Sequence, residues 1–261
     1  VLMPVFNGEE YLSESIESIL NQTYENFEFL IIDDNSSDKS IEIIKSYKDA
    51  RIRLIKCTEN KGQTRRLNQG LNIAKGKYIA RIDQDDVSMV QRLKKQIDFF
   101  KVNPNVGLLG TKYIQIDKFG KILKHENDNN ELQTNSNAIK WQLLWRQVIG
   151  HSTVMFRKKV ALKCGGYNLK YTFAQDFALW SMISRITDIS QLNEVLMKYR
   201  IHQEAQSSTI PDDEREEEKL LIRKSNIETL IKRSISLKDV RLIINGSLGK
   251  KDISFQEYNR L

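Results

Sequence analysis

Apolar and polar positions change their spacing several times along the first 83 residues, and each change marks a new element. Short apolar runs alternate with stretches in which apolar side chains recur every three or four residues. The runs are typical of buried strands and the spaced positions of amphipathic helices. The expected strands are 1–6, 27–33, 51–57 and 77–83, and the expected helices lie within 9–22, 38–47 and 63–75. This alternation predicts an α/β fold with a mostly parallel central sheet and helices on both faces.

The second half of the chain is less regular. Apolar runs predict strands at 106–116, 152–156 and 195–199, and helical spacing predicts helices at 139–148 and 173–186. The stretch 126–137 is polar and rich in Asn, which predicts a loop. From Asp212 onwards the pattern is helical, and it opens on DDEREEEK, acidic residues that the helix dipole favours at an N-terminus. We therefore expect one α/β domain over 1–205 and a helical extension over 206–261.

Composition narrows the class of protein. The chain has 261 residues, of which 40% are hydrophobic and 29% charged, a globular balance that allows a substantial core. No apolar run approaches the ~18 residues that a membrane-spanning helix needs, and the opening VLMPVFN lacks the basic start of a signal peptide. Two cysteines, Cys57 and Cys164, are too few for a disulfide framework, which favours the cytoplasm.

The charge balance favours anionic partners. The formal net charge is +7, which suits nucleic acid, anionic lipid or a phosphorylated small molecule. Basic and acidic residues are interspersed along the chain, so an extended nucleic-acid groove is not expected. A peripheral contact with the anionic inner face of the cell membrane fits the same charge.

Candidate chemistry follows the ends of two predicted parallel strands. The strand 27–33 leads into DDNSSD and the strand 77–83 into DQDD. Ligands of open α/β sheets bind at the carboxyl ends of the strands, which places both acidic groups on one edge. A purely structural interpretation stays open for each, because Asp, Asn and Ser cap helices and form turns. In the functional interpretation, DDNSSD accepts the imide N–H of uracil, and DQDD holds Mg²⁺ or Mn²⁺, which prefer oxygen ligands.

Common phosphate-binding motifs are missing from the sequence. It contains neither GxxxxGKS/T nor GxGxxG, the loops that cradle phosphates with backbone N–H groups. A cation would therefore have to neutralise most of the charge on a phosphorylated ligand.

Several longer strings then resemble family 2 glycosyltransferases, which have the fold called GT-A. They are MPVFNGEEYLSESIESILNQTYENFEFLIIDDNSSDKS and NKGQTRRLNQGLNIAKGKYIARIDQDD, followed in order by QRLKKQIDFF, HSTVMFRK, GGYN, QDFALW and YRIH. The resemblance covers roughly residues 1–205. It implies a nucleoside-diphosphate-sugar donor, a divalent metal (Mn²⁺ or Mg²⁺) and inversion at the anomeric carbon. It further implies a nucleotide-sugar-binding half over about 1–110 and an acceptor-binding half over 111–205.

The resemblance implies roles on the donor side. The family's donor contacts correspond here to Pro4, Phe6, Glu9, Asp34 and Asp83. Asp34 matches the carboxylate that contacts the uracil imide, and Asp83 the one that faces the ribose or sugar. Many members carry Arg directly before the Asn of the following helix, where this chain has Leu67. Either Arg65 or Arg66 then takes that contact.

Metal and base positions follow from the same resemblance. Asp85 matches the metal ligand of the DxD element, with Asp86 as its substitute, and His202 in YRIH matches a histidine that completes the metal shell in some members. Asp176 in QDFALW matches the general base, and Gln175 replaces the common Glu before it. A structural role for His202 and a helix-capping role for Asp176 remain alternatives.

Two further residues belong to the expected acceptor side. His151 stands where the family keeps a histidine near the acceptor, and Trp180 follows Asp176 by four residues on the same predicted helix. The structural alternatives are a histidine at a strand edge and a tryptophan that packs the helix. For the extension 206–261 we expect a role in acceptor binding or assembly rather than in chemistry.

The expected function is sugar transfer to a hydroxyl of a glycan or lipid-linked acceptor, in surface polysaccharide or glycoconjugate biosynthesis. Two alternatives stay open. A sugar-nucleotide nucleotidyltransferase would need a Gly-rich N-terminal loop, which PVFNGEE is not. A catalytically inactive nucleotide-sugar-binding module would not need both Asp85 and Asp176.

Overall fold

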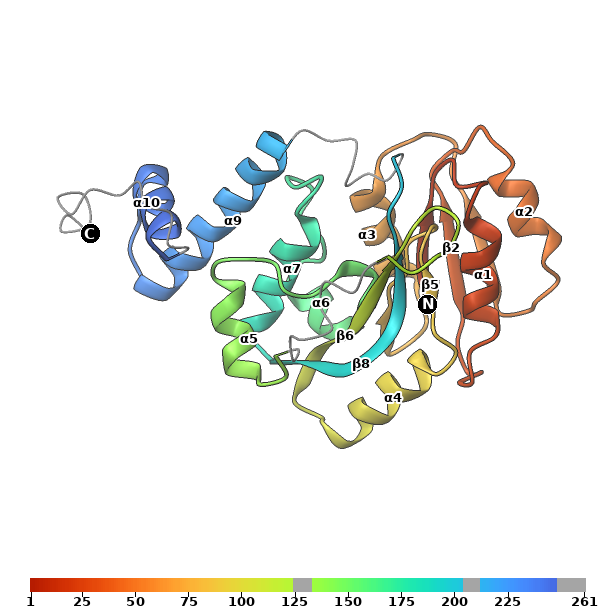
Figure 1. Ribbon diagram of the computed structural model, residues 1–261, viewed down its shortest axis with the longest axis horizontal. Helices are drawn as coiled ribbons and strands as arrows, with labels where there is room; N and C mark the ends of the chain where they lie inside the picture. Colours follow the sequence, from red (N-terminus) through yellow and green to blue (C-terminus); the bar gives the residue numbers. More distant parts are fainter. Residues whose placement is uncertain (124–132, 204–211, 248–261) are drawn as a thin grey trace.

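The computed structural model describes residues 1–123, 133–203 and 212–247. Its strands are β1 (Leu2–Val5), β2 (Phe29–Asp33), β3 (Ile52–Lys56), β4 (Tyr78–Ala80), β5 (Val87–Ser88), β6 (Val106–Ile116), β7 (Met155–Arg157) and β8 (Asp188–Arg200). Its helices are α1 (Leu12–Leu20), α2 (Ser40–Ser46), α3 (Gln63–Ile73), α4 (Arg92–Val102), α5 (Ser136–Leu143), α6 (Lys158–Lys163), α7 (Gln175–Ser184), α9 (Asp212–Ile231) and α10 (Leu237–Ser247), with a 3₁₀ turn η1 at His151–Thr153. Figure 1 shows them in sequence colours.

The first sheet has the order β1-β2-β3, and all its pairs are parallel. Every residue of β1 and β2 is buried, because helices cover both faces. Met3 and Ile31 pack in the cluster that contains the apolar side of α1 and Ile44 of α2. Leu2 and Leu30 face the opposite way and pack with Leu67 and Leu71 of α3. The predicted strand–helix alternation and the helices on both faces are confirmed.

The second sheet has the order β4-β7-β6-β8-β5 and is mixed. Its long pair, β6 with β8, is parallel, whereas β4 with β7, β7 with β6 and β5 with β8 are antiparallel. A parallel bridge between Leu2 and Arg81 joins the two sheets. The ends of β1, β2 and β4 therefore lie along one edge, as expected for the α/β class.

Several predicted boundaries in the second half are wrong. The helix expected at 139–148 is α5, which begins at Ser136 and ends at Leu143. The strand expected at 152–156 begins as the turn η1, and β7 follows it at Met155. The strand expected at 195–199 is the much longer β8. The predicted loop 126–137 lies partly outside the described residues, and its last two residues belong to α5.

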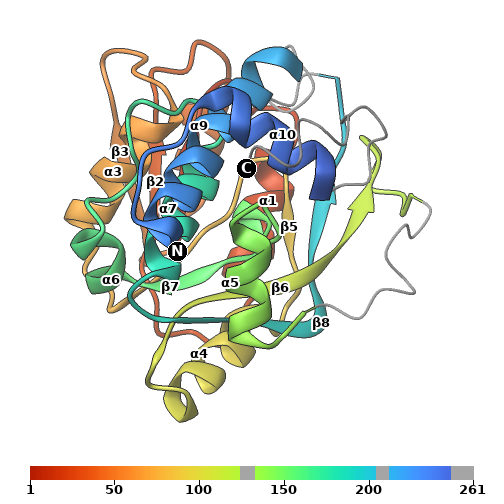
Figure 2. The ribbon, with the colours of Figure 1, turned by 90° about the vertical axis from the view of Figure 1, so that its left-hand side faces the viewer.

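The C-terminal helices pack both on each other and on the rest of the chain. Leu220, Ile227, Val240 and Ile244 form a small cluster between α9 and α10, while Ile222 of α9 joins the main core. Figure 1 and Figure 2 together show α9 beside α7 and α10 on the far side of α9. The domain boundary proposed at 205/206 falls in the stretch 204–211, outside the described residues, and stays a prediction. No helix in the described ranges has the length and apolar character that crossing a membrane requires.

Candidate active site

The end of β1 is tied to the turn after β4. Gln84 accepts a hydrogen bond from the Phe6 N–H at 2.8 Å and donates to the Phe6 carbonyl oxygen at 3.0 Å. A Cβ at Gly8 would lie 2.7 Å from Gln84 Cδ, so glycine is needed for this close approach. Pro4 is buried within β1, and the Phe6 side chain beside it is 45% exposed. Phe6 thus presents an accessible ring at the sheet edge.

Glu9, in the loop after β1, contacts the residues that begin α2. Its Oε2 accepts from the Lys39 N–H at 3.0 Å, and its own N–H donates to Asp38 Oδ2 at 2.9 Å. The first bond satisfies one of the amides that the N-terminus of α2 leaves without an intrahelical partner, and the second ties the Glu9 backbone to Asp38. The side chain expected in the nucleoside pocket therefore also fixes the loop 6–9 against α2.

Asp34, just after β2, is buried and makes several contacts. Its carboxylate accepts from the N–H groups of Lys61 at 2.9 Å and Gly62 at 2.7 Å, and it pairs with Arg66. Gly62 has a φ of 84°, which glycine adopts without strain. Arg66 is buried and Arg65 is exposed. Of the two arginines, only Arg65 faces solvent.

Asp83, three residues after β4, is an ionised carboxylate. Its Oδ2 accepts from Ser152 Oγ at 2.7 Å, and its Oδ1 accepts from Gln63 Nε2 at 3.1 Å and pairs with Arg81. Burial acts to raise the pKa of Asp83, but the Arg81 charge and the Ser152 hydrogen bond outweigh it, so the pKa lies below its usual value. The acidic strand end therefore keeps its negative charge at neutral pH.

A short chain of amides connects this strand end to α7. Gln63, which donates to Asp83, accepts in turn from Gln175 Nε2 at 2.9 Å. Gln175 and Asp176 form the first turn of α7. The regions expected to hold the donor and the general base are thus joined by hydrogen bonds, although Asp83 and Gln175 lie 92 positions apart in the sequence.

Asp85 and His202 meet although 117 residues separate them in the chain. His202 Nε2 lies 2.9 Å from Asp85 Oδ2, and their side chains are 10% and 20% exposed. Arg200, at the end of β8, donates through Nε to the Asp85 carbonyl oxygen at 2.9 Å. Strand β8 therefore brings His202 to the turn after β4.

Asp86 has a different place from Asp85. It is fully buried, and its Oδ1 accepts from the Arg200 N–H at 3.0 Å. Burial, with the charges of Asp85 and Asp83, raises its pKa well above the usual value. Because Asp86 is buried and already bonded to Arg200, the structure favours Asp85 over Asp86 as a ligand, and the substitution of one for the other stays a prediction. The Asp86 contact holds β8 to the turn.

Asp176 is a buried acid in the first turn of α7. It is 5% exposed, its Oδ1 accepts from the Phe177 N–H at 2.7 Å, and its Oδ2 accepts from Gln147 Nε2. Burial raises its pKa to about 7, against the lowering effect of these hydrogen bonds. The residue before the helix, Ala174, is the N-cap. Asp176 is therefore not the N-cap residue, but its carboxylate satisfies the Phe177 N–H of the first turn, so the capping alternative stays open beside the role of base, and its pKa lies near neutrality.

The expected acceptor-side residues lie deeper than the sequence suggested. Trp180 is 0% exposed and packs against His151, Tyr167 and Phe156. It cannot contact a sugar, which corrects the expectation, since a stacking platform needs an exposed ring face. His151 Nε2 lies 3.0 Å from the Tyr167 hydroxyl. Burial lowers the pKa of His151 to about 3, so the ring is neutral beneath the site.

Sequence reasoning overlooked the residues that connect these groups. Gln63, Arg81 and Ser152 all contact Asp83, and Gln147 contacts Asp176. Gln84 stood inside the DQDD string and had a visible signal there. The others are ordinary polar residues, whose partners become apparent only when distant segments are brought together.

Three-dimensional comparison finds the fold of this chain in glycosyltransferases of known structure. A crystal structure of Staphylococcus aureus TarS (residues 1–349) with UDP-GlcNAc superposes with a TM-score of 0.71 at 18% identity, covering 95% of this chain and 70% of that one. The mannosyltransferase PcManGT from Pyrobaculum calidifontis, with GDP-Man and Mn²⁺, gives 0.68 at 15% identity, covering 94% and 68%. At such identities the likeness establishes the GT-A-type fold.

Sequence comparison establishes the family. A Haemophilus influenzae protein described as an uncharacterized glycosyltransferase is 30% identical across 100% of this chain and 85% of its own length. The O-antigen biosynthesis glycosyltransferase WbnJ of Escherichia coli is 36% identical over 77% of this chain and 79% of its own. The similarity thus extends past residue 205, where the sequence motifs ended. The family model described as Glycosyl transferase family 2 matches residues 1–165. The chain belongs to this family of glycosyltransferases.

Proposed function

We propose that this chain transfers a sugar from a nucleoside-diphosphate sugar to a hydroxyl of a glycan or lipid-linked acceptor, with inversion at the anomeric carbon. The observation that carries the proposal is the amide chain from Asp83 through Gln63 to Gln175. It holds an ionised strand end and the helix turn bearing Asp176 in one site. The similarity to WbnJ supports a role in surface polysaccharide biosynthesis.

Asp176 is the proposed general base. A pKa of about 7 is close to the optimum for a base that works at neutral pH. The acceptor hydroxyl oxygen forms the new bond to the anomeric carbon while the bond to the diphosphate breaks, and the proton passes to Asp176. One displacement from the face opposite the leaving group inverts the configuration. No covalent sugar–protein intermediate is required.

Asp85 and His202 are the proposed protein ligands of a divalent metal. In the described segments no group of three His, Cys, Asp or Glu side chains can hold an ion, so protein ligation rests on this pair. Their 2.9 Å separation suits neighbouring ligands, which stand about 3 Å apart around a small divalent ion. When bound, such an ion neutralises charge on the leaving diphosphate. The carboxylate and imidazole together suit Mn²⁺, the ion in the PcManGT structure.

The donor is proposed to be a UDP-sugar. Asp34 accepts three hydrogen bonds, and a carboxylate offers about four acceptor positions, which leaves one for the uracil imide. TarS was solved with UDP-GlcNAc and PcManGT with GDP-Man, so the shared fold does not determine which nucleobase the donor carries. Pro4, Phe6 and Glu9 are proposed to line the nucleoside pocket. Arg65 is proposed to contact the diphosphate, because Arg66 is committed to Asp34.

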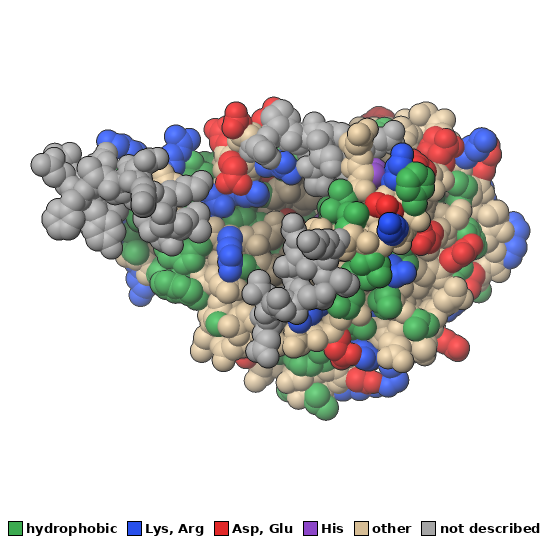
Figure 3. Space-filling view, in the orientation of Figure 1, with side chains coloured by type: hydrophobic (Ala, Val, Ile, Leu, Met, Phe, Trp, Pro, Cys, Tyr) green, Lys and Arg blue, Asp and Glu red, His purple; other side chains and the backbone are tan. Residues whose placement is uncertain are grey.

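A peripheral contact with the inner face of the cell membrane is proposed for the end of the α9–α10 hairpin. The whole hairpin, residues 212–247, carries eight basic and eight acidic side chains, but six of the acidic ones lie at the start of α9, and residues 230–241 at the end of the hairpin carry four basic side chains and one acidic. Leu230, Ile231 and Leu237 are exposed there, and so are Lys232 and Lys238. Figure 3 shows apolar and basic side chains gathered over this part of the molecule. Exposed apolar side chains next to basic ones suit binding to an anionic lipid surface, where a lipid-linked acceptor would be found.

A donor panel tests the proposed function. Purified protein is incubated with UDP-, GDP- and ADP-sugars, with and without Mn²⁺, and release of the nucleoside diphosphate is measured. We expect Mn²⁺-dependent release from a UDP-sugar, and its loss in Asp85→Ala. Tight binding of the same donor without release, in the presence of acceptor extracts, would instead identify an inactive binding module.

A further inference from the structure

A single carboxylate from the C-terminal helices contacts the segment that leads into Asp176. Glu218 Oε1 accepts from the Thr172 N–H at 2.7 Å, and its Oε2 accepts from the N–H groups of Phe173 at 2.9 Å and Ala174 at 2.8 Å. Three consecutive backbone amides thus share one side chain, which comes from α9, more than 40 residues further along the chain. Hydrogen bonds to a charged acceptor are roughly twice as strong as neutral ones.

The segment that leads into α7 takes its acceptor from another helix. The N-cap of α7 is Ala174, which has no side-chain oxygen to accept from a backbone N–H, as Ser, Thr, Asp or Asn would have. Glu218 satisfies the N–H of this residue and of the two before it, while the Phe177 N–H further into the turn is satisfied by Asp176. Negative charge at a helix N-terminus is also favoured by the helix dipole. Asp176 lies two residues beyond the last amide that Glu218 holds.

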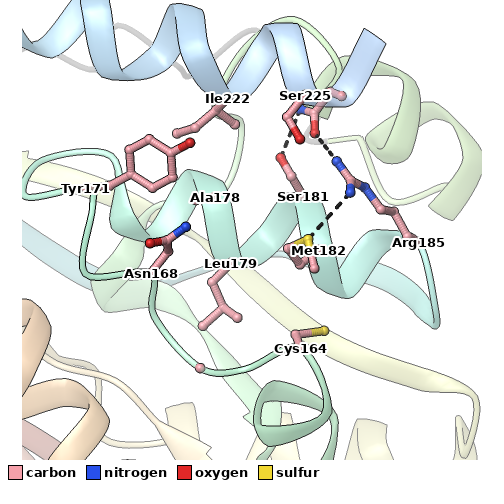
Figure 4. Close-up of a pocket in the computed structure, with 12 residues that line it drawn as sticks. Cys164, Asn168, Tyr171, Ala178, Leu179, Ser181, Met182, Arg185, Ile222 and Ser225 are labelled. Atoms are coloured by element: carbon pink, nitrogen blue, oxygen red, sulfur yellow. Dashed lines mark hydrogen bonds between the residues drawn. The ribbon is translucent and has the colours of Figure 1, made fainter. Parts of the chain in front are cut away.

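The same face of α9 is anchored to α7 at two further positions. Ile222 packs into the main core, and Asn226 donates to Ser181 Oγ at 3.0 Å and to the Leu143 carbonyl oxygen at 2.9 Å. With Glu218 these residues follow a spacing of four, which places them on one side of the helix. Figure 4 shows α9 lying along α7, with the polar contacts around Ser181 and Arg185 at one end.

Between these anchors the two helices do not fill the space. A cavity of about 130 Å³ is lined by Leu179 and Met182 of α7, by Ser225 of α9, and by Tyr171 from the segment before α7. Side-chain packing in this stretch therefore constrains the start of α7 less than a filled interface would. On the other side of the segment, Thr64 donates to the Tyr171 carbonyl oxygen at 3.2 Å. The amides of 172–174 depend on Glu218 alone among the hydrogen bonds of the described residues.

We propose that Glu218 is a positioning residue for the transfer reaction, fixing the turn that carries Asp176. The C-terminal extension then completes the catalytic apparatus, in contrast to the expectation that it serves acceptor binding or assembly only. The proposal rests on the proposed role of Asp176 as the base. A base displaced by about 1 Å can lose roughly 10²-fold in rate, while the nucleotide site, on other elements, is unaffected.

Three variants test this proposal. Glu218→Ala removes all three acceptor contacts, Glu218→Gln retains one carbonyl oxygen, and Glu217→Ala is the matched control, an exposed glutamate of the same helix. We expect kcat to fall by about 10- to 100-fold in Glu218→Ala and by less in Glu218→Gln, with the donor KM within about twofold in both. Wild-type kcat in a folded Glu218→Ala, or an equal loss in Glu217→Ala, would overturn the proposal.

Two further measurements separate positioning from general destabilisation. If Glu218 acts through Asp176, Glu218→Ala should cost little additional kcat in an Asp176→Asn background, because effects through one group are not additive. Full additivity would overturn the proposal. Hydrogen exchange of residues 172–176 should accelerate in Glu218→Gln and not in Glu217→Ala, and unchanged exchange would disprove the contact. That measurement needs no turnover, so it distinguishes failure of this proposal from failure of the proposed function.

Discussion

Asp83, which is partly exposed, and Asp176, which is buried, are aspartates of one site whose surroundings move their pKa values in opposite directions. Asp83, in the half expected to bind the donor, has Arg81 and Ser152 beside it, and its pKa is lowered. Asp176, in the half expected to bind the acceptor, has only uncharged hydrogen-bond donors, and burial raises its pKa to about 7. Environments that separate the pKa values of two acids assign them different roles.

The contrast explains how one site can hold a charged ligand and still move a proton. In the turn after β4, the lowered pKa of Asp83 keeps its carboxylate charged, which suits a cation and the diphosphate it accompanies. At the start of α7, a carboxylate near its pKa can accept a proton and release it again. Gln63 and Gln175 connect the two regions without bringing a charge of their own.

Replacing Asp85, in the turn after β4, should have the largest effect on the transfer rate. In Asp85→Ala, metal binding loses one of its two proposed protein ligands, and we expect transfer to fall by about 10³-fold. Chelator should abolish the wild-type activity in the same way. Asp98→Ala, an exposed carboxylate on α4, is the control and should be unaffected. Full transfer in excess chelator would remove the metal from the account.

Acidification should lower kcat through Asp176, at the start of α7. Since the pKa of Asp176 is about 7, the ionised base decreases about tenfold for each pH unit below 7, and kcat should decrease with it. Two units therefore correspond to about 10²-fold. With Mn²⁺ kept saturating at each pH, so that protons do not displace the metal from its proposed ligands, the donor KM should change little, because Asp83 stays ionised. A kcat that is flat from pH 8 to pH 5 would show that Asp176 does not titrate there.

The identity of the nucleobase should have a smaller effect, which concerns the affinity for the nucleoside diphosphate. We expect UDP to bind at least about tenfold more tightly than GDP or ADP, which corresponds to one hydrogen bond to a charged acceptor. Isothermal calorimetry with the three diphosphates and Mn²⁺ measures this directly. Equal affinities, or a preference for GDP, would contradict the role of Asp34.

The smallest expected effect concerns the α9–α10 hairpin. A basic side chain near an anionic membrane contributes about 1 kcal/mol, so Lys232→Gln should weaken binding to phosphatidylserine-containing vesicles by about fivefold. Lys94→Gln on α4 is the control. Flotation at low and high salt tests the electrostatic part. Absence of salt-sensitive binding in the wild type would favour a soluble acceptor.

The alternation of apolar runs and helical spacing was sufficient to predict the first sheet, because β1 and β2 are short, fully buried strands flanked by amphipathic helices. It also placed Asp176 in the first turn of its helix. The second sheet was harder to predict, since eight of the thirteen residues of β8 are exposed or partly exposed and its apolar pattern is visible only near the C-terminal end. Local pattern identifies an element when that element has one clear buried side.

Trp180 and Glu218 show where that reasoning ends. Sharing a helix face with Asp176 suggested that Trp180 borders the site, but eight of the ten residues of α7 are buried, so no face of this helix is reserved for ligand. Glu218 is one of six acidic residues in DDEREEE, and nothing local distinguishes it from Glu217. Its partners are backbone amides of a distant segment, which leave no signature in the sequence.

The transfer rate of Asp176→Asn, measured with its donor dissociation constant, tests the central claim most directly. Asparagine fills the same space but cannot take the proton, so we expect turnover to fall by roughly 10²-fold or more with the donor affinity nearly unchanged. The raised pKa means that ionising Asp176 destabilises the folded state as pH rises from about 4 through 7. The variant should therefore melt no lower than the wild type at pH 8, which excludes unfolding as the cause. Near-normal turnover in this variant would contradict the account.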